Sequence, residues 1–187
     1  MIGLAALLAG CAPTVQRQDQ PAASSQSANQ DLQACLRVVY YSSEYVPLRP
    51  RIPLDMNDAT VGQISDASLA TEDEIRTILL THPKVQACRN AYLDRIDQTT
   101  PTIAAIVADG YARLEQSLID LIEKNENWGE HLRRTRAISV ASQSELAAEN
   151  RRIAAGSPQS NEAELARRHS AAFQAYEQTQ QIINNMK

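Results

Sequence analysis

The three cysteines are the most reactive side chains of this chain, and their surroundings differ. Cys11 directly follows an apolar run, residues 2–8, and two small residues, whereas Cys35 and Cys88 lie far inside the chain. A thiol can be alkylated to a thioether, oxidised to a disulfide or, as a thiolate, act as a nucleophile. The segment around each cysteine therefore decides which of these reactions we expect there.

The tetrapeptide Leu8-Ala9-Gly10-Cys11 resembles the lipobox of bacterial lipoproteins. In that family the small residues give the lipoprotein signal peptidase access to the backbone, and the thiol takes a diacylglyceryl group. The resemblance covers residues 1–11 and implies that a signal peptide, residues 1–10, is removed and that Cys11 carries lipid. No basic residue precedes Cys11, which departs from the usual signal peptide. Ala12 resembles the residue that follows the cysteine in outer-membrane lipoproteins, so the resemblance implies the periplasmic face of the outer membrane.

The segment after Cys11 is rich in Gln, Ala and Ser, contains Pro13 and Pro21, and has no apolar stripe. Such a segment cannot offset its conformational entropy by burying apolar surface. We therefore predict that residues 11–30 comprise the lipidated cysteine and a flexible linker. The linker would tether a folded domain, residues 31–187, to the membrane.

With Cys11 lipidated, Cys35 and Cys88 remain as a pair in an oxidising compartment, which predicts a disulfide. In the chain-entropy model its closure stabilises the fold by about 4 kcal/mol. The alternative is two buried thiols. Neither cysteine has a second Cys or His at ligand spacing, so the sequence predicts no metal site.

The histidines, His82, His131 and His169, give no catalytic or metal-binding pattern. None has a His or Glu three or four residues away, as a helical zinc site requires. We interpret them as exposed or partly packed, and the many carboxylates as solvated helix faces. The chain also lacks a G-x-S-x-G elbow and a P-loop. These patterns predict a protein without catalytic activity and without a cofactor.

The C-terminal half contains three dibasic pairs and one tryptophan. If the last two helices bring the pairs together, they form a patch for anionic lipid headgroups, lipopolysaccharide or an acidic partner. The alternative is a solvated face on which arginines alternate with glutamates. The tryptophan is either an exposed contact residue or a buried plug of the core. These candidate contact residues are Arg133, Arg134, Arg151, Arg152, Arg167, Arg168 and Trp128.

Helical periodicity dominates the folded part and predicts an all-α bundle of about five to six helices. Thr71 and Glu74 form a capping box, and Pro83 and Pro101 suit the first turns of helices. We expect the last two helices to form a long antiparallel hairpin. The predicted helices are 31–43, 71–81, 83–96, 101–124, 130–155 and 161–185, with a short strand at 38–41 as the alternative for part of the first.

A long connection, residues 45–70, precedes the capping box. Pro47, Pro50 and Pro53 recur every three residues in it, which matches the turn of a polyproline II helix. We interpret this segment as a stiff extended stretch laid across the helices. Because so long a loop is uncommon inside a domain, it either packs on the bundle or carries the function.

Composition narrows the classes of function. A formal net charge of −4, from 18 basic and 22 acidic residues, gives no electrostatic case for nucleic acid. We expect a lipid-anchored envelope protein that acts as a non-catalytic binding or structural accessory subunit for an envelope protein partner. In architecture it resembles secretion pilotins and accessory subunits of envelope machines. The alternatives are a peptidoglycan-directed hydrolase and a small-ligand carrier with a cavity between helices.

Overall fold

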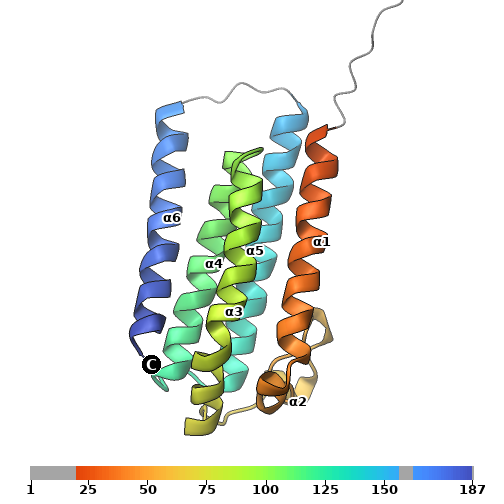
Figure 1. Ribbon diagram of the computed structural model, residues 1–187. Helices are drawn as coiled ribbons and strands as arrows, with labels where there is room; N and C mark the ends of the chain where they lie inside the picture. The colour runs from red at the N-terminus through yellow and green to blue at the C-terminus, as the bar shows by residue number, and fades with distance from the viewer. Residues whose placement is uncertain (1–19, 156–161, 187) are drawn as a thin grey trace, which may run out of the picture.

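The computed structural model describes residues 20–155 and 162–186, and this part of the chain is an all-α bundle without strands, as predicted. Cys11, the expected signal peptide and the expected break at 156–158 lie outside these residues. None of the described helices is long and apolar enough to cross a membrane. The α-helices are α1 Gln20–Tyr41, α2 Val61–Ile64, α3 Glu72–Asp97, α4 Pro101–Ile122, α5 Trp128–Ala154 and α6 Glu162–Asn185, and the 3-10 helices are η1 Ser43–Leu48 and η2 Met56–Asp58 (Figure 1).

Helix α4 is the centre of the bundle because it packs against α3, α5 and α6. Its buried face carries small residues, among them Ala104, Ala108 and Ala112, which let neighbouring helices approach closely. Leu93 of α3 and Tyr176 of α6 fill the space around these alanines. The outermost layer is α1, which packs on α3 (Figure 1).

The two C-terminal helices are as long as predicted and run antiparallel, but they do not pack on each other (Figure 1). Among the described residues, no Cα atom of α5 lies within 8 Å of one in α6. Each helix packs on α4 instead. The two helices therefore follow each other antiparallel, as predicted, but they are not a packed pair. Each buries its apolar surface against α4 and not against the other helix.

Helix α3 is continuous where the sequence predicts two helices that meet at Pro83. The predicted capping box is confirmed at its start: Thr71 Oγ1 accepts from the Glu74 amide at 3.2 Å, and Glu74 Oε2 accepts from the Thr71 amide at 2.8 Å. Proline removes one helical donor but fixes a helical φ. Buried side chains on both sides of it, His82 and Cys88, hold the two halves in line.

Helix α1 begins at Gln20 and not at Asp31, so the expected linker is shorter than residues 11–30. Ala28 is buried in the cluster around Leu93, and Arg95 of α3 pairs with Asp31 and donates to Ser27 Oγ at 3.0 Å. Tertiary contacts thus order a stretch that has no apolar stripe of its own. The helix also continues to Tyr41, which excludes the alternative strand at 38–41.

The predicted polyproline II conformation is wrong for the start of the 45–70 segment, because Pro47 lies inside the 3-10 helix η1. The segment folds under the bundle, where Leu48 is buried. The Gly129 amide donates to the Asp66 carbonyl at 2.8 Å. A Cβ at Gly129 would lie 2.5 Å from the Ile64 carbonyl oxygen, so only glycine permits this close approach.

Candidate functional site

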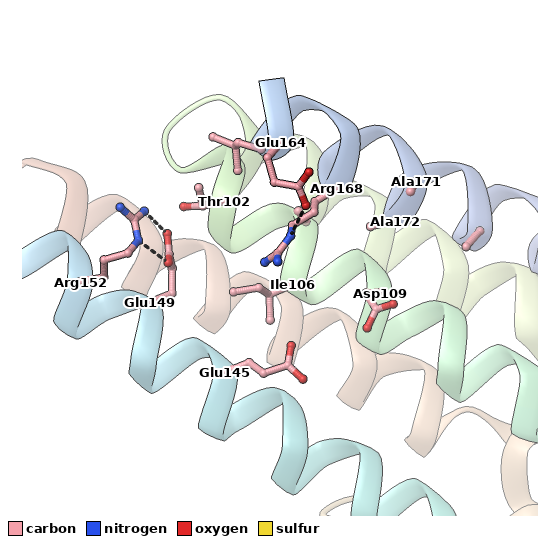
Figure 2. Close-up of a pocket in the computed structure, with 13 residues that line it drawn as sticks. Thr102, Ile106, Asp109, Glu145, Glu149, Arg152, Glu164, Arg168, Ala171 and Ala172 are labelled. Atoms are coloured by element: carbon pink, nitrogen blue, oxygen red, sulfur yellow. Dashed lines mark hydrogen bonds and ion pairs between the residues drawn. The ribbon is translucent and has the colours of Figure 1, made fainter. Parts of the chain in front are cut away.

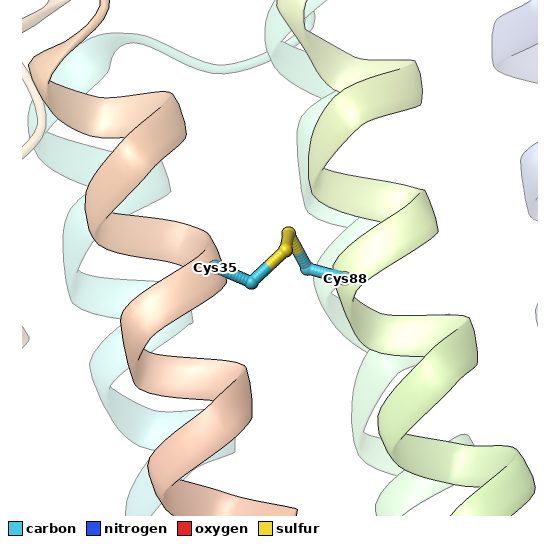
Figure 3. The surroundings of a disulfide bond; sticks show 2 residues. All are labelled: Cys35 and Cys88. Carbon is cyan, nitrogen blue, oxygen red and sulfur yellow. A yellow bond between two sulfur atoms is a disulfide. The ribbon is translucent and has the colours of Figure 1, made fainter.

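A disulfide joins Cys35 of α1 to Cys88 of α3, as the sequence predicts (Figure 3). The Cα atoms are 5.8 Å apart, within the range of natural disulfides. Cys88 is buried together with Leu32 and Val39 of α1. The bond therefore fixes the first helix to the helix beside the centre of the bundle.

His82 is buried, which corrects the prediction of an exposed or partly packed histidine. Its Nε2 atom lies 2.8 Å from Glu115 Oε2, without the angles of a hydrogen bond. Arg89 donates to Glu115 Oε1 at 2.5 Å and lies over the ring of Tyr111 at 4.9 Å. Burial is the largest single effect on Arg89 and would lower its pKa, but the charge of Glu115, the nearby tyrosines and the hydrogen bond to Glu115 together raise that pKa. Glu115 is fully buried, so the interpretation of the carboxylates as solvated is wrong here.

A second buried cluster contains a serine, a histidine and a glutamate, but it is not a catalytic triad. Ser117 Oγ donates to Glu126 Oε1 at 2.6 Å and lies 2.9 Å from Nδ1 of His131. The same Nδ1 is 3.2 Å from Glu126 Oε1. Serine has one proton, which it gives to the carboxylate, so the histidine cannot take it as a base. Ser117 is also fully buried, out of reach of a substrate.

Charge compensation keeps Glu126 ionised in this cluster. Burial raises the pKa of its carboxyl, but the hydrogen bonds from His131 and Ser117 and the contact with Arg134 outweigh burial and lower that pKa below 4.5. The third histidine, His169, lies 2.6 Å from Asp97 Oδ1 and stacks on Phe173. No group of three His, Cys, Asp or Glu residues in the described part of the chain could hold a metal ion.

Trp128 is a plug of the core and not an exposed contact residue, since it has no exposed surface. Its Nε1 donates to Glu74 Oε2 at 3.3 Å, and the guanidinium of Arg51 lies over its ring at 5.8 Å. Arg51 also donates to Glu74 Oε1 at 2.7 Å and pairs with Asp66. No local sequence pattern indicates this cluster, because its members come from three separate segments.

The dibasic pairs do not form one patch. Arg133 and Arg134 lie near the start of α5, where Arg133 donates to the Ile64 carbonyl and Arg134 pairs with Asp120 at 2.5 Å and Glu126 at 3.3 Å. The other two pairs lie at the opposite end of the bundle, near the end of α5 and the start of α6 (Figure 1).

Two arginines at that opposite end are tied to glutamates of their own helices. Arg152 pairs with Glu149 at 2.5 Å, and Arg168 with Glu164 at 3.2 Å (Figure 2). Arg167 lies 3.9 Å from the same Glu164. These ion pairs favour the interpretation of a solvated face on which arginines alternate with glutamates.

The candidate site is a groove of about 710 Å³ between α5 and α6, with α4 as its floor (Figure 2). The floor and the α6 wall are apolar and mostly small, whereas the rims carry four carboxylates and two arginines. The lining residues are Thr102, Ala105, Ile106 and Asp109 of α4, Glu145, Glu149 and Arg152 of α5, and Glu164, Leu165, Arg168, Ala171, Ala172 and Ala175 of α6.

The groove exists because α5 and α6 both pack on α4 and not on each other. A Cβ at Gly110 would lie 2.8 Å from Ser142 Oγ, which marks a close approach of α4 and α5. Between Ser139 and Ala155, α5 has no buried residue. This half of the helix therefore has unburied surface along the groove, opposite α6.

Charges in the groove are unequally compensated. Asp109 of α4 and Glu145 of α5 share one partner, Arg113, at 2.5 and 3.6 Å, and both carboxylates are half-exposed. The hydrogen bond from Arg152 lowers the pKa of Glu149, so this carboxylate is ionised at neutral pH. Ionised carboxylates around an apolar floor suit the binding of a cationic, partly apolar partner rather than proton donation.

A second hollow, of about 470 Å³, lies between α5 and the segment under the bundle. Met56, Ile64, Leu132 and Val140 make it mainly apolar. It lacks opposed charged walls, so it is the less specific of the two hollows.

Comparison of the chain with models of protein families, with curated proteins and with solved structures found no match.

Proposed function

We propose that this chain is a lipoprotein of the bacterial cell envelope, anchored through Cys11 at the periplasmic face of the outer membrane, and that it is a non-catalytic binding subunit for an envelope protein. The observation that carries the binding function is the groove between α5 and α6. An open groove with an apolar floor and charged rims has the anatomy of a protein-binding surface.

The position of α1 supports the anchored arrangement. Residues 12–19 connect Cys11 to α1, and a chain of that length spans at most about 30 Å. Helix α1 begins at the end of the bundle where α5 ends and α6 begins (Figure 1). An anchor on Cys11 would therefore hold the groove end of the bundle near the membrane, and the disulfide would secure α1 against being pulled away.

The hydrolase alternative is less well supported. It requires a cleft that contains a reactive group, and the Ser117, His131 and Glu126 cluster is buried and wrongly oriented for a nucleophile. One observation supports the small-ligand carrier. The volume of the groove, about 710 Å³, lies within the range of roughly 300–1,000 Å³ that is typical of ligand sites. An open groove with charged rims departs from the enclosed apolar cavity expected of such a carrier.

Anchoring is tested by fractionating cells that express the full chain and its Cys11→Ala variant. The proposal expects the parent protein in the outer-membrane fraction and the variant in the soluble periplasmic fraction. Equal membrane association of both proteins would refute lipid anchoring through Cys11.

Binding through the groove is tested by affinity purification from cross-linked cells. Ala171→Arg places a large charged side chain in the groove, and Ala166→Arg places the same side chain on an exposed position of α6 outside it. We expect a stoichiometric envelope protein with the parent and with Ala166→Arg, and its loss with Ala171→Arg. Recovery of the protein alone in every preparation would refute the binding function.

A further inference from the structure

We infer that the groove between α5 and α6 binds a basic amphipathic helix of the partner, which places small apolar residues on the floor and a Lys or Arg beside Asp109 and Glu145. This inference rests on the proposed binding function and names the chemistry of its partner.

The shape of the groove fits a helix. Its α6 wall extends from Glu164 to Ala175, about 16 Å or three helical turns at 1.5 Å per residue. Ala105 of the floor and Ala172 of the wall have short side chains, so a guest backbone can approach closely. A helix in this position would complete a four-helix arrangement with α4, α5 and α6 and would bury the thinly packed half of α5.

The charge of the groove selects a basic guest. Of the four lining carboxylates, Glu149 and Glu164 are matched by Arg152 and Arg168 on the same helices. The other two, Asp109 and Glu145, share a single guanidinium.

One negative charge thus remains in excess between α4 and α5. Figure 2 shows Asp109 on α4, the floor of the groove, and Glu145 on α5, one of its walls. A cationic side chain of a guest helix would lie beside these two carboxylates, next to the Arg113 that they share.

The same charges disfavour two other occupants. An anionic lipid headgroup would be repelled by Asp109 and Glu145, which together carry one charge more than the arginine that they share. A second copy that set its own Asp109 and Glu145 against these two carboxylates would place like charges across the interface, and such charges oppose association. A basic segment of another protein removes the excess instead.

The test uses a defined peptide probe and the purified full chain. The probe is a capped peptide of about 15 residues, made of Ala, Leu and Lys so that a helix has one apolar and one basic face. Its twin carries Glu in place of every Lys. Binding is followed by the change in backbone amide NMR shifts, which gives both the dissociation constant and the residues affected.

We expect the Lys peptide to shift the amide NMR signals of residues 102–109, 145–152 and 164–175. The Glu twin should bind at least tenfold more weakly. An exposed charge pair contributes ~0.2–1 kcal/mol, so Glu145→Gln should weaken binding of the Lys peptide by about 1.4- to fivefold. Glu177→Gln, which removes a carboxylate of α6 outside the groove, is the control and should leave affinity unchanged.

Equal affinity for both peptides, shifts that map outside the groove, or no binding of the Lys peptide would overturn the inference. A shift of the dimer equilibrium instead of peptide binding would assign the groove to a second copy. None of these peptide results depends on the lipid anchor. A failure of the proposed function would appear instead in the fractionation and affinity-purification experiments, so the two failures can be told apart.

Discussion

The two halves of α5 differ in what they contribute. In the first half, Trp128, His131, Leu132 and Ile138 are buried, and the helix closes over the segment that folds under the bundle. From Ser139 to Ala155 no residue is buried, although the helix remains regular. The contrast indicates that the first half stabilises the fold, while the second half supplies one wall of a groove at little benefit to stability.

The same division holds for the charged groups. Inside the bundle, Glu74, Glu115 and Glu126 are buried, and each carboxylate accepts at least one hydrogen bond. In the groove, Asp109 and Glu145 are half-exposed and share one arginine. Buried, compensated charges specify a packing arrangement, whereas exposed and under-compensated charges are available to a partner.

The largest expected effect on stability comes from removing the Trp128 side chain from the core. Trp128→Ala removes a fully buried indole, and large-to-small core substitutions of this kind cost about 3–5 kcal/mol. Val140→Ala is the control in the second half of α5, where the side chain is 60% exposed, and should change stability by less than about 0.5 kcal/mol. Urea unfolding measures both. Similar losses for the two variants would contradict the division of α5.

The disulfide should give the next largest effect. Cys35→Ser frees α1 from α3 and should lower the free energy of unfolding by roughly 2–4 kcal/mol. Thermal unfolding of the variant, and of the parent protein with and without reductant, measures this change. A variant with the stability and the non-reducing gel mobility of the parent would show that the bond does not form.

The base of the bundle should lose stability in acid. Hydrogen bonds to Glu126 and Glu74 hold the pKa of each carboxyl below its ordinary value of 4.5, against the opposing effect of burial. Their contribution is present above pH 4.5 and is lost as the pH falls through the folded-state pKa values. Urea unfolding between pH 7 and 3 measures the decline, which Glu126→Gln should reduce. An unchanged pH dependence in that variant would exclude Glu126 as a source.

The smallest expected effect concerns the crossing of α4 and α5. Alanine is favoured over glycine inside a helix by up to about 1 kcal/mol, but a Cβ at Gly110 would lie 2.8 Å from Ser142 Oγ. We expect Gly110→Ala to be nearly neutral, because the hydroxyl must rotate away at some cost. In the double variant with Ser142→Ala the hydroxyl is absent, so the higher helix propensity of alanine at position 110 should raise the free energy of unfolding. Additive effects of the two substitutions would show that these residues do not touch.

Local signals made much of the fold predictable. The Thr71–Glu74 capping box, the helical period of α4 and the parity of Cys35 and Cys88 each depend on neighbouring residues or on a simple count. The continuation of α3 through Pro83 and the start of α1 at Gln20 depend on tertiary contacts, which no short window of sequence contains.

The groove was not predicted, although part of its signal was present. The apolar seam of α5 becomes thin after Ile138, which indicates a helix half with little to bury. Glu115 falls on the same helical face as Ala108, Tyr111 and Ile122, a sign that this carboxylate is buried. Whether α5 and α6 pack on each other or leave a groove above α4 depends on how the apolar surfaces of all three helices fit together. The sequence of any one helix does not contain this information.

The central claim is that a partner binds the groove end of the bundle and not its base. A photo-crosslinking phenylalanine derivative at Ala171, in the groove, and at Val61, an 84% exposed residue of α2 at the base, tests it within the same cells. We predict a specific adduct with an envelope protein from position 171 and none from position 61. An adduct from position 61 alone, or equal adducts from both positions, would contradict the account.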